Sequence, residues 1–590
     1  MRALLKTTFL IFGLFCCLIS FGAYLTNVPV TIKQPNGKEL KIYATGDEFH
    51  NWLHDIDGYT IIQNPKTGYY CYAILDKDEI FASKYIVGDI DPITSDLKPY
   101  VNISSEKILA KRNEFMSTSP NKTVISKAND IKSLKNPVTI NNIVVYIRFA
   151  DQTEFPANQA TYTSMFNNTT SGANSMRNYF NETTYNKLDI STSFYPTNNG
   201  TTIISYQDNH IRDYYVPYSA ANDSGYIYSW QRKSREYALL KRAINFIESQ
   251  IPTSLNLDYD SDGYVDNICF IIRGGTTNSS TLLWPHYWTL YSAPEHINGK
   301  LVWDYNFQLE DDLAYIGVGV LCHEMYHTLG APDLYHNNND NMDPVGDWDL
   351  MEHTINPPQH MGAYMKSKYG GWITTVPEIT ASGSYTLNPI TSSSNNCYKI
   401  PICGSSQYLF LEYRRKTGVF DSSIPNSGLI IYRINESYNG NLNGSGAGGV
   451  TDEVYVFRLD GSLTSKGNSS NAYLSSNSGR IVFHNTSNPY CFISNGDLGN
   501  IYIKNISSAD NTISFDVRFC DGDDIIYSYT DSLPSLTNAS NSIITSGTVT
   551  IKSTDNVTFE AGDEVILNGG FEIQQGGVFE IYMNGCGCVD

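Results

Sequence analysis

The sequence predicts a mixed α/β core that is preceded by a small β-rich unit and followed by all-β modules. Strand-like apolar runs at 143–149 and 267–272 flank an amphipathic helical segment at 236–251, which is the alternation of an α/β layer. A second helical segment, 313–329, is apolar around most of its circumference and is therefore expected to be buried. After Trp372 the chain changes to short β-like runs separated by turn residues, which indicates β domains.

The chain of 590 residues is too long for one domain. The changes in composition predict a signal peptide (1–22), an N-terminal domain (23–103), a linker (104–137), the α/β core (138–376), a β-sandwich-like domain (377–520) and a C-terminal β-repeat module (521–590). The linker is rich in Ser, Asn and Lys without periodicity, so it is expected to be exposed. A folded unit joined to the core by such a linker is the organisation of a cleavable propeptide, although it is also that of an ordinary N-terminal domain.

The first residues have the organisation of a secretory signal. Arg2 and Lys6 precede an apolar run from Phe9 to Phe21, and Gly22 provides the small residue of a cleavage site. The alternative is an uncleaved anchor, because the run nearly reaches the length that spans a bilayer. We therefore expect a secreted, extracellular or cell-surface protein, with no stable membrane insertion after the signal is removed.

The charge and the cysteines exclude other classes of protein. A formal net charge of -20 argues against nucleic acid or an anionic membrane as a partner. Nine cysteines remain after the signal, and an odd number spread this thinly is not a disulfide framework. Cys397 and Cys403 are close enough to close a loop. Cys71 could cap a metal ion as a thiolate, but a position on a strand is the favoured interpretation.

The buried helical segment carries the motif His323-Glu324-x-x-His327. Residues four apart lie on the same face of a helix, so the two imidazoles can point at one zinc ion. Glu324 lies one step round the helix, within reach of a water molecule beside that ion. Buried histidines can also be ordinary packed side chains, but an unpaired polar group is costly there and a metal ion removes that cost.

A third zinc ligand is expected just beyond the end of the helix. Gly330 is best suited to the left-handed conformation that ends a helix, and Pro332 prevents continuation. The chain then turns back and brings Asp333 to the metal side, where a carboxylate oxygen is a sound zinc ligand. Glu352 is the alternative third ligand, but it leaves the spacing of Gly330 and Asp333 unexplained.

An acidic run precedes the second predicted strand. Asp258, Asp260 and Asp262 alternate, Gly263 permits a sharp turn, and Asp266 closes the run. This order of carboxylates suits calcium, although the terminal glutamate of an EF-hand is missing, and a solvated acidic turn is the alternative. The Asn/Asp-rich segment 336–353 is expected to be a loop that could hold a second cation through Asp340, Asp343 or Asp347.

Several segments of the chain, taken together, resemble the M6 peptidases, the immune inhibitor A-like secreted zinc metalloproteases. The resemblance covers about 26–520 and rests on GDEFHNW, DGYTI, MRNYFNETTYNKLDIS, DYDSDGYVD, LLWPHYW, HEMYHTLGAPDLY, GDWDLM and HMGAYMKSKYGGWI. It implies a metzincin-like core, calcium near that core and an N-terminal propeptide. It also implies His323, His327 and Asp333 as zinc ligands, Glu324 as the catalytic residue, and Met351 in a turn beneath the metal.

The predicted function is that of a secreted zinc metalloendopeptidase, made as a zymogen, whose partners are protein substrates and its own N-terminal domain as inhibitor. Glu324 would take a proton from the attacking water and pass it to the leaving amine. Tyr364, Tyr369 and His360 are candidates for oxyanion or substrate contacts, and each could equally be a packing residue. The alternative function is a catalytically inactive, calcium-dependent binding or adhesion protein.

Overall fold

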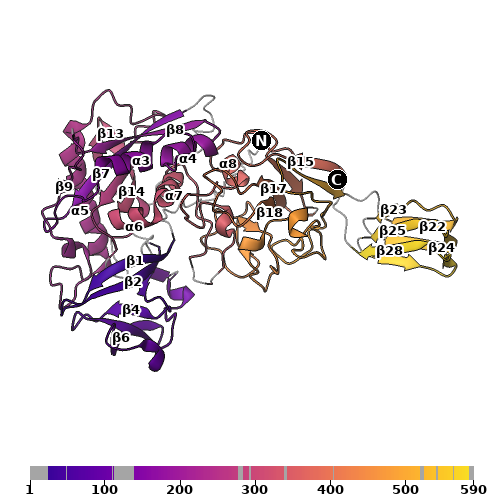
Figure 1. Ribbon diagram of the computed structural model, residues 1–590, viewed down its shortest axis with the longest axis horizontal. Helices are drawn as coiled ribbons and strands as arrows, with labels where there is room; N and C mark the ends of the chain where they lie inside the picture. Colours follow the sequence, from indigo (N-terminus) through magenta and orange to yellow (C-terminus); the bar gives the residue numbers. More distant parts are fainter. Residues whose placement is uncertain are drawn as a thin grey trace, which may run out of the picture.

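The computed structural model describes residues 24–47, 50–108, 110–111, 138–198, 200–276, 283–290, 294–337, 340, 342–402, 404–518, 524–539, 542–561 and 564–583. The expected signal peptide and most of the expected linker lie outside these residues. In Figure 1 the units follow one another, with the C-terminal module at one end of the molecule. Among the described helices none is long and apolar enough to cross a membrane.

The N-terminal domain is a six-stranded antiparallel meander in which the strands pair in chain order. Its strands are β1 (Leu25–Lys33), β2 (Glu39–Gly46), β3 (Asn51–His54), β4 (Thr60–Gln63), β5 (Tyr70–Asp76) and β6 (Glu79–Ile86). Cys71 lies on β5 as a buried free thiol. The domain contacts the α/β core: β1 packs on α6, the amide of Ala220 donates to the carbonyl of Pro65 (2.9 Å), and the rings of Tyr24 and Tyr335 are 5.5 Å apart.

The core is a mixed sheet with helices on both faces (Figure 1). Its strands run in the order β11-β14-β10-β7-β8, with the short β9 (Tyr206–Gln207) beside β7. The parallel members are β7 (Val138–Arg148), β8 (Leu188–Tyr195), β10 (Ile268–Ile272) and β14 (Asp304–Leu309), and β11 (His286–Thr289) is an antiparallel edge strand. Alternate residues of β7 enter opposite apolar clusters, as expected for a strand covered on both faces.

The helices of the core divide between the two faces of the sheet. Helix α5 (Ser229–Ile247) packs on one face, and α3 (Gln159–Asn167), α4 (Met176–Thr183) and α7 (Val318–Thr328) share the cluster on the other. The single helix expected at 313–329 is interrupted: α6 (Glu310–Ile316) ends at Gly317, whose φ of 71° breaks the helix before α7 begins. A Cβ at Gly317 would lie 2.4 Å from the Asn356 amide, so only glycine fits this close approach.

Two sheets with an apolar cluster between them form the next domain. The four-stranded sheet consists of β16 (Cys397–Pro401), β17 (Tyr408–Arg414), β18 (Gly428–Ile434) and β19 (Val454–Val456), and the three-stranded sheet of β15 (Gly383–Leu387), β20 (Tyr502–Lys504) and β21 (Ile513–Arg518). Cys397 is a buried free thiol, while Cys403 lies outside the described residues. Helix α8 (Ala363–Lys368) links this domain to the core.

The C-terminal module is a small stack of parallel strands. Its two sheets contain β22 (Asp524–Thr530), β24 (Ser542–Ile551), β26 (Glu564–Leu567) and β27 (Phe571–Ile573), and β23 (Leu536–Ala539), β25 (Asn556–Ala561) and β28 (Val578–Met583). Ser542 pairs with Glu564 and Leu536 pairs with Thr558, so partners are 22 residues apart (564 − 542 and 558 − 536). That repeat is typical of a solenoid, in which each turn stacks on its neighbours.

Candidate metal centre

Two histidines of α7 meet at the centre of the core. His323 is fully buried and His327 is 4% exposed. Nδ1 of His323 lies 2.9 Å from the carbonyl oxygen of Leu350, and Nδ1 of His327 lies 2.8 Å from that of Ala331. Because a carbonyl oxygen only accepts, both Nδ1 atoms carry the proton and both Nε2 atoms carry a lone pair in the neutral rings. The two Nε2 atoms lie 3.1 Å apart, and two lone pairs at that distance repel.

Asp333 completes the cluster. Its Oδ1 atom lies 3.1 Å from Nε2 of His323 and 3.3 Å from Nε2 of His327. Ligand atoms about 2.0–2.1 Å from a tetrahedral zinc ion are separated by about 3.3 Å, so the three atoms have the spacing that zinc requires. Burial acts to raise the pKa of Asp333, and His327 and His323 lower it only when an imidazole carries a second proton on Nε2, which is the proton that an ion would replace. A proton could satisfy one of these contacts, whereas a cation satisfies all three, and the donor set therefore fits zinc.

The position of Asp333 depends on the end of the helix and on the β-sandwich-like domain. Gly330 has a φ of 95°, and its amide donates to the carbonyl of His327 (2.8 Å), as expected for a left-handed helix end. The amide of Asn441 then donates to the carbonyl of Asp333 (3.0 Å). The neighbouring Gly440 lies so close that a Cβ there would be 2.7 Å from that oxygen. Sequence reasoning missed both residues, because 107 positions separate Gly440 from Asp333 (440 − 333).

Met351 lies in a turn that contacts helix α7 through the carbonyl of Leu350. Its side chain is fully buried, its amide donates to Oδ1 of Asp349 (2.8 Å), and its carbonyl accepts from the amide of Leu334 (2.9 Å). The preceding carbonyl, that of Leu350, holds His323. This turn therefore fixes the orientation of the ring of His323, and hydrogen-bond partners of metal ligands generally act in this way.

Glu324 and Glu352 occupy different surroundings. Glu324 follows His323 on α7 and its side chain is fully buried. Glu352 does not join the two histidines; its Oε2 atom accepts from the amides of Val345 and Gly346, the latter at 2.5 Å, and it clusters with Asp343 and His353. The alternative in which Glu352 is the third ligand of this centre therefore does not fit the structure.

The three candidates for oxyanion or substrate contacts lie in buried networks of their own. The hydroxyls of Tyr364 and Tyr369 donate to the two carboxylate oxygens of Glu453, at 2.5 and 2.6 Å. Nδ1 of His360 lies 2.9 Å from the ammonium of Lys366, and burial with that cation holds the pKa of His360 well below its usual value. Each of the three therefore binds a partner in the packed interior, which favours the alternative that they are packing residues, and their role as oxyanion or substrate contacts stays a prediction.

The acidic run is brought together only in part. Asp258, Asp260 and Asp262 offer ligand atoms within 4.8 Å of one another. Both oxygens of Asp266 instead accept from the amide of Tyr259, at 3.2 and 3.0 Å, and Oδ2 of Asp258 accepts from the ammonium of Lys300 (2.6 Å). A calcium ion at this run would have to displace Lys300, so calcium binding through these four residues stays a prediction.

Strand β11 forms the edge of the sheet beside the centre. It contacts α7, and the ring of Tyr287 on this strand lies 5.9 Å from the ring of His327. Because β11 pairs only with β14 among the described strands, its other edge can accept an extended peptide. The orientation of this strand could not be predicted from the sequence, because it depends on pairing with β14, where Thr289 lies opposite Asp304, 15 residues further along.

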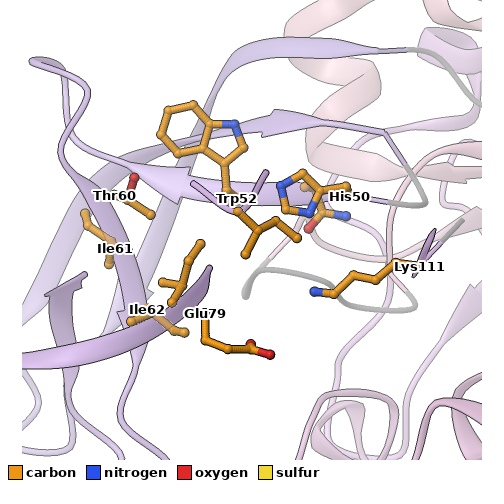
Figure 2. Close-up of a pocket in the computed structure, with 10 residues that line it drawn as sticks. His50, Trp52, Thr60, Ile61, Ile62, Glu79 and Lys111 are labelled. Atoms are coloured by element: carbon orange, nitrogen blue, oxygen red, sulfur yellow. The ribbon is translucent and has the colours of Figure 1, made fainter. Parts of the chain in front are cut away.

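A separate cavity of about 130 Å³ lies in the N-terminal domain. Figure 2 shows His50 and Lys111 pointing toward it, with Ile61 and Glu79 among the lining residues. Nε2 of His50 lies 2.9 Å from the side-chain oxygen of Asn102 and donates to it, so Nδ1 is unprotonated. Burial, with a smaller contribution from the charge of Lys111, lowers the pKa of His50 to about 4.

Acidification is expected to destabilise the N-terminal domain through His50. The unfolded chain takes up the proton near pH 6.5 and the folded domain only near pH 4, so stability falls as pH drops through this range, by about 3 kcal/mol in total. Hydrogen exchange of β3 and β4, corrected for intrinsic rates, measures the loss. The His50→Gln variant should lose this pH dependence, and the exposed His296→Gln variant should keep it; a flat profile in the unmodified protein would contradict the assignment.

Comparisons with known proteins identify no family for this chain. No protein-family model matches the sequence, and no curated protein matches it. Among solved structures, the crystal structure of wild-type OgpA from Akkermansia muciniphila matches with a TM-score of 0.23 and 12% identity, over 50% of this chain and 77% of that chain. A likeness at that level supports no argument about fold or activity. The resemblance to M6 peptidases therefore stays a prediction.

Proposed function

We propose that this chain is a secreted zinc-dependent metalloendopeptidase of the metzincin-like M6 type, which hydrolyses peptide bonds in proteins. The observation that carries the proposal is the meeting of three buried ligand atoms, from His323, His327 and Asp333, within 3.3 Å of one another. Glu324 is the next residue along the same helix, and β11 lies beside it. This combination of ligands, base and edge strand is what peptide hydrolysis requires.

Each part of the chain has a separate task in the proposed reaction. His323, His327 and Asp333 would hold a zinc ion, which would supply a Lewis acid for the carbonyl group and lower the pKa of a bound water. The edge of β11 that faces away from β14 would bind the substrate backbone as an added strand and so hold the scissile bond beside α7. Glu324 takes a proton from the attacking water and gives it to the leaving amine. The carbonyls of Leu350 and Ala331 keep both imidazoles in the tautomer that can bind zinc.

The N-terminal domain is proposed to keep the full chain latent. Two contacts favour this role: Tyr24 packs on Tyr335, two residues after Asp333, and the carbonyl of Pro65 binds the amide of Ala220. Cleavage within the segment 104–137 would separate this domain from the core. The domain would then leave as an intact unit, because its six strands pair with one another.

Removal of the metal tests the proposed function. Casein cleavage should disappear when the protein is treated with a zinc-selective chelator and should return with Zn²⁺ but not with Ca²⁺, because the ligand set contains two imidazoles. The assay is run on the full chain and on protein cut between 104 and 137, and the cut form should be the more active. Undiminished cleavage by protein shown to be free of zinc would overturn the proposal. Zinc binding without cleavage in either form would favour the inactive binding protein.

A further inference from the structure

A second cluster of metal-binding side chains lies in the segment 343–353, outside the zinc centre proposed above. Asp343, Glu352 and His353 offer ligand atoms within 4.8 Å of one another. Glu352 is 1% exposed, whereas the side chains of Asp343 and His353 are 52% and 39% exposed. The cluster therefore has a buried floor and an open side through which an ion can enter.

The orientation of His353 favours an ion. Its Nδ1 atom lies 2.8 Å from Oδ1 of Asp347, and its Nε2 atom lies 3.6 Å from Oδ1 of Asp343. When Nδ1 donates to Asp347, Nε2 faces Asp343 across a gap too long for a hydrogen bond, and an ion bound there would take the place of a proton on Nε2. A carboxylate that accepts from one ring nitrogen while the other nitrogen faces an ion is the arrangement of metal-binding histidines.

Glu352 provides the second and independent observation. Its Oε2 atom accepts from the amides of Val345 and Gly346. Its Oε1 atom is buried and has no hydrogen-bond partner among the residues that the structure describes. An acceptor buried without a partner is costly, and a cation between Glu352, Asp343 and His353 would satisfy it.

We propose that Asp343, Glu352 and His353 bind a divalent transition-metal ion such as Zn²⁺ or Mn²⁺, with Asp347 positioning His353. One imidazole with two carboxylates suits these ions better than calcium, which prefers an all-oxygen shell. Ligand atoms on opposite sides of such an ion are about 4.2 Å apart, so a spread of up to 4.8 Å closes with a small movement of the two exposed side chains.

The proposed ion would stabilise the turn that supports the first centre. It joins Asp343 to Glu352 and His353, and so closes the segment that contains Leu350 and Met351. The carbonyl of Leu350 orients His323. The second ion would thus act as a structural clamp and would take no part in the reaction.

Metal stoichiometry distinguishes the two sites, whether or not the chain is a peptidase. Protein is equilibrated with enough Zn²⁺ to fill two sites and with a large excess of Ca²⁺, which competes for the acidic run 258–262, and bound zinc is counted by mass spectrometry. We expect two zinc ions in the unmodified chain, one after the Asp343→Asn and His353→Gln substitutions together, and one after His323→Ala and His327→Ala together. The exposed Asp497→Asn variant is the control and should keep two.

Two results would overturn the second site. One is unchanged zinc content in the Asp343→Asn, His353→Gln protein; the other is no zinc in the His323→Ala, His327→Ala protein, which would mean that a proton and not an ion fills the second cluster. Should the doubly substituted cluster variant fail to fold, Asp347→Asn keeps all three ligands. In that variant the affinity of the second site should fall about 10–100-fold, while that of the first is unchanged; equal affinities in both proteins would also overturn the proposal.

Discussion

Glu324→Gln is expected to abolish casein cleavage while leaving the zinc content unchanged. Glutamine keeps the shape of the side chain but cannot accept a proton at neutral pH, so the rate should fall by about 10²–10⁴-fold, the usual contribution of a general base. Because Glu324 is not one of the three clustered ligand atoms, zinc binding should survive. The measurement is kcat/KM on protein cut between 104 and 137, with zinc counted in the same preparation.

The control for Glu324→Gln is Glu378→Gln, which changes a surface carboxylate paired with Lys399 (3.5 Å) and should leave activity intact. Full activity in the Glu324→Gln protein would remove the proposed base from the mechanism. A variant that has lost both zinc and folded structure would instead show that Glu324 is a packing residue of α7. The measurements of activity, zinc content and folding therefore distinguish a catalytic role of Glu324 from a structural one.

Arg414→Met is expected to lower the free energy of unfolding by about 3–5 kcal/mol, because it removes one partner of a buried ion pair and leaves the other charges unpaired. Arg414 is fully buried on β17 and donates to both oxygens of Asp421, at 3.0 and 2.5 Å. It also donates to Oε1 of Glu412 (3.3 Å) and to the backbone carbonyls of Trp348 (2.5 Å) and His360 (3.2 Å). Urea unfolding of the full chain measures the effect.

The adjacent Arg415→Met is the matched control for Arg414→Met, because Arg415 is only partly buried and partly exposed charges contribute little. It should change stability by less than about 1 kcal/mol. The Arg414→Met protein should also bind zinc more weakly, since Trp348 lies next to the turn of Asp349 and Leu350 that orients His323. Equal unfolding midpoints for the two variants would show that the buried pair does not stabilise this part of the fold.

Features that depend only on neighbouring residues can be predicted from the sequence. The spacing of His323 and His327 predicts a shared helical face, and Gly330 predicts the end of the helix, because both depend on one turn of backbone. The same local reasoning failed at Gly317. A glycine inside a helical pattern is usually tolerated, and the contact with Asn356 that requires a break there comes from a distant part of the chain.

Features that depend on distant residues could not be predicted. Tyr364 is one example: the sequence makes it a candidate contact residue but gives no indication that its hydroxyl donates to Glu453, 89 residues further along. His336 is a second example: its two ring nitrogens each lie 2.8 Å from a carboxylate oxygen, one of Asp340 and one of Asp452, which is 116 residues away. The hydrophobic periodicity of a sequence indicates which side of a helix or strand is buried. It does not indicate which distant residue contacts that side.

The hydrogen bond from Asn441 to the backbone of Asp333 limits how short a fragment of the chain can be and still carry the proposed activity. A fragment that ends at Trp372 would retain all three proposed zinc ligands in its sequence yet lose the segment between β18 and β19 that contains Asn441 and holds the third ligand in place. Natural variation within 439–454 could therefore tune metal affinity without any change in the His-Glu-x-x-His motif. The smallest fragment that is active on its own should therefore extend to Arg518. A truncation or gene fusion that keeps only the residues up to Trp372 should yield an inactive protein.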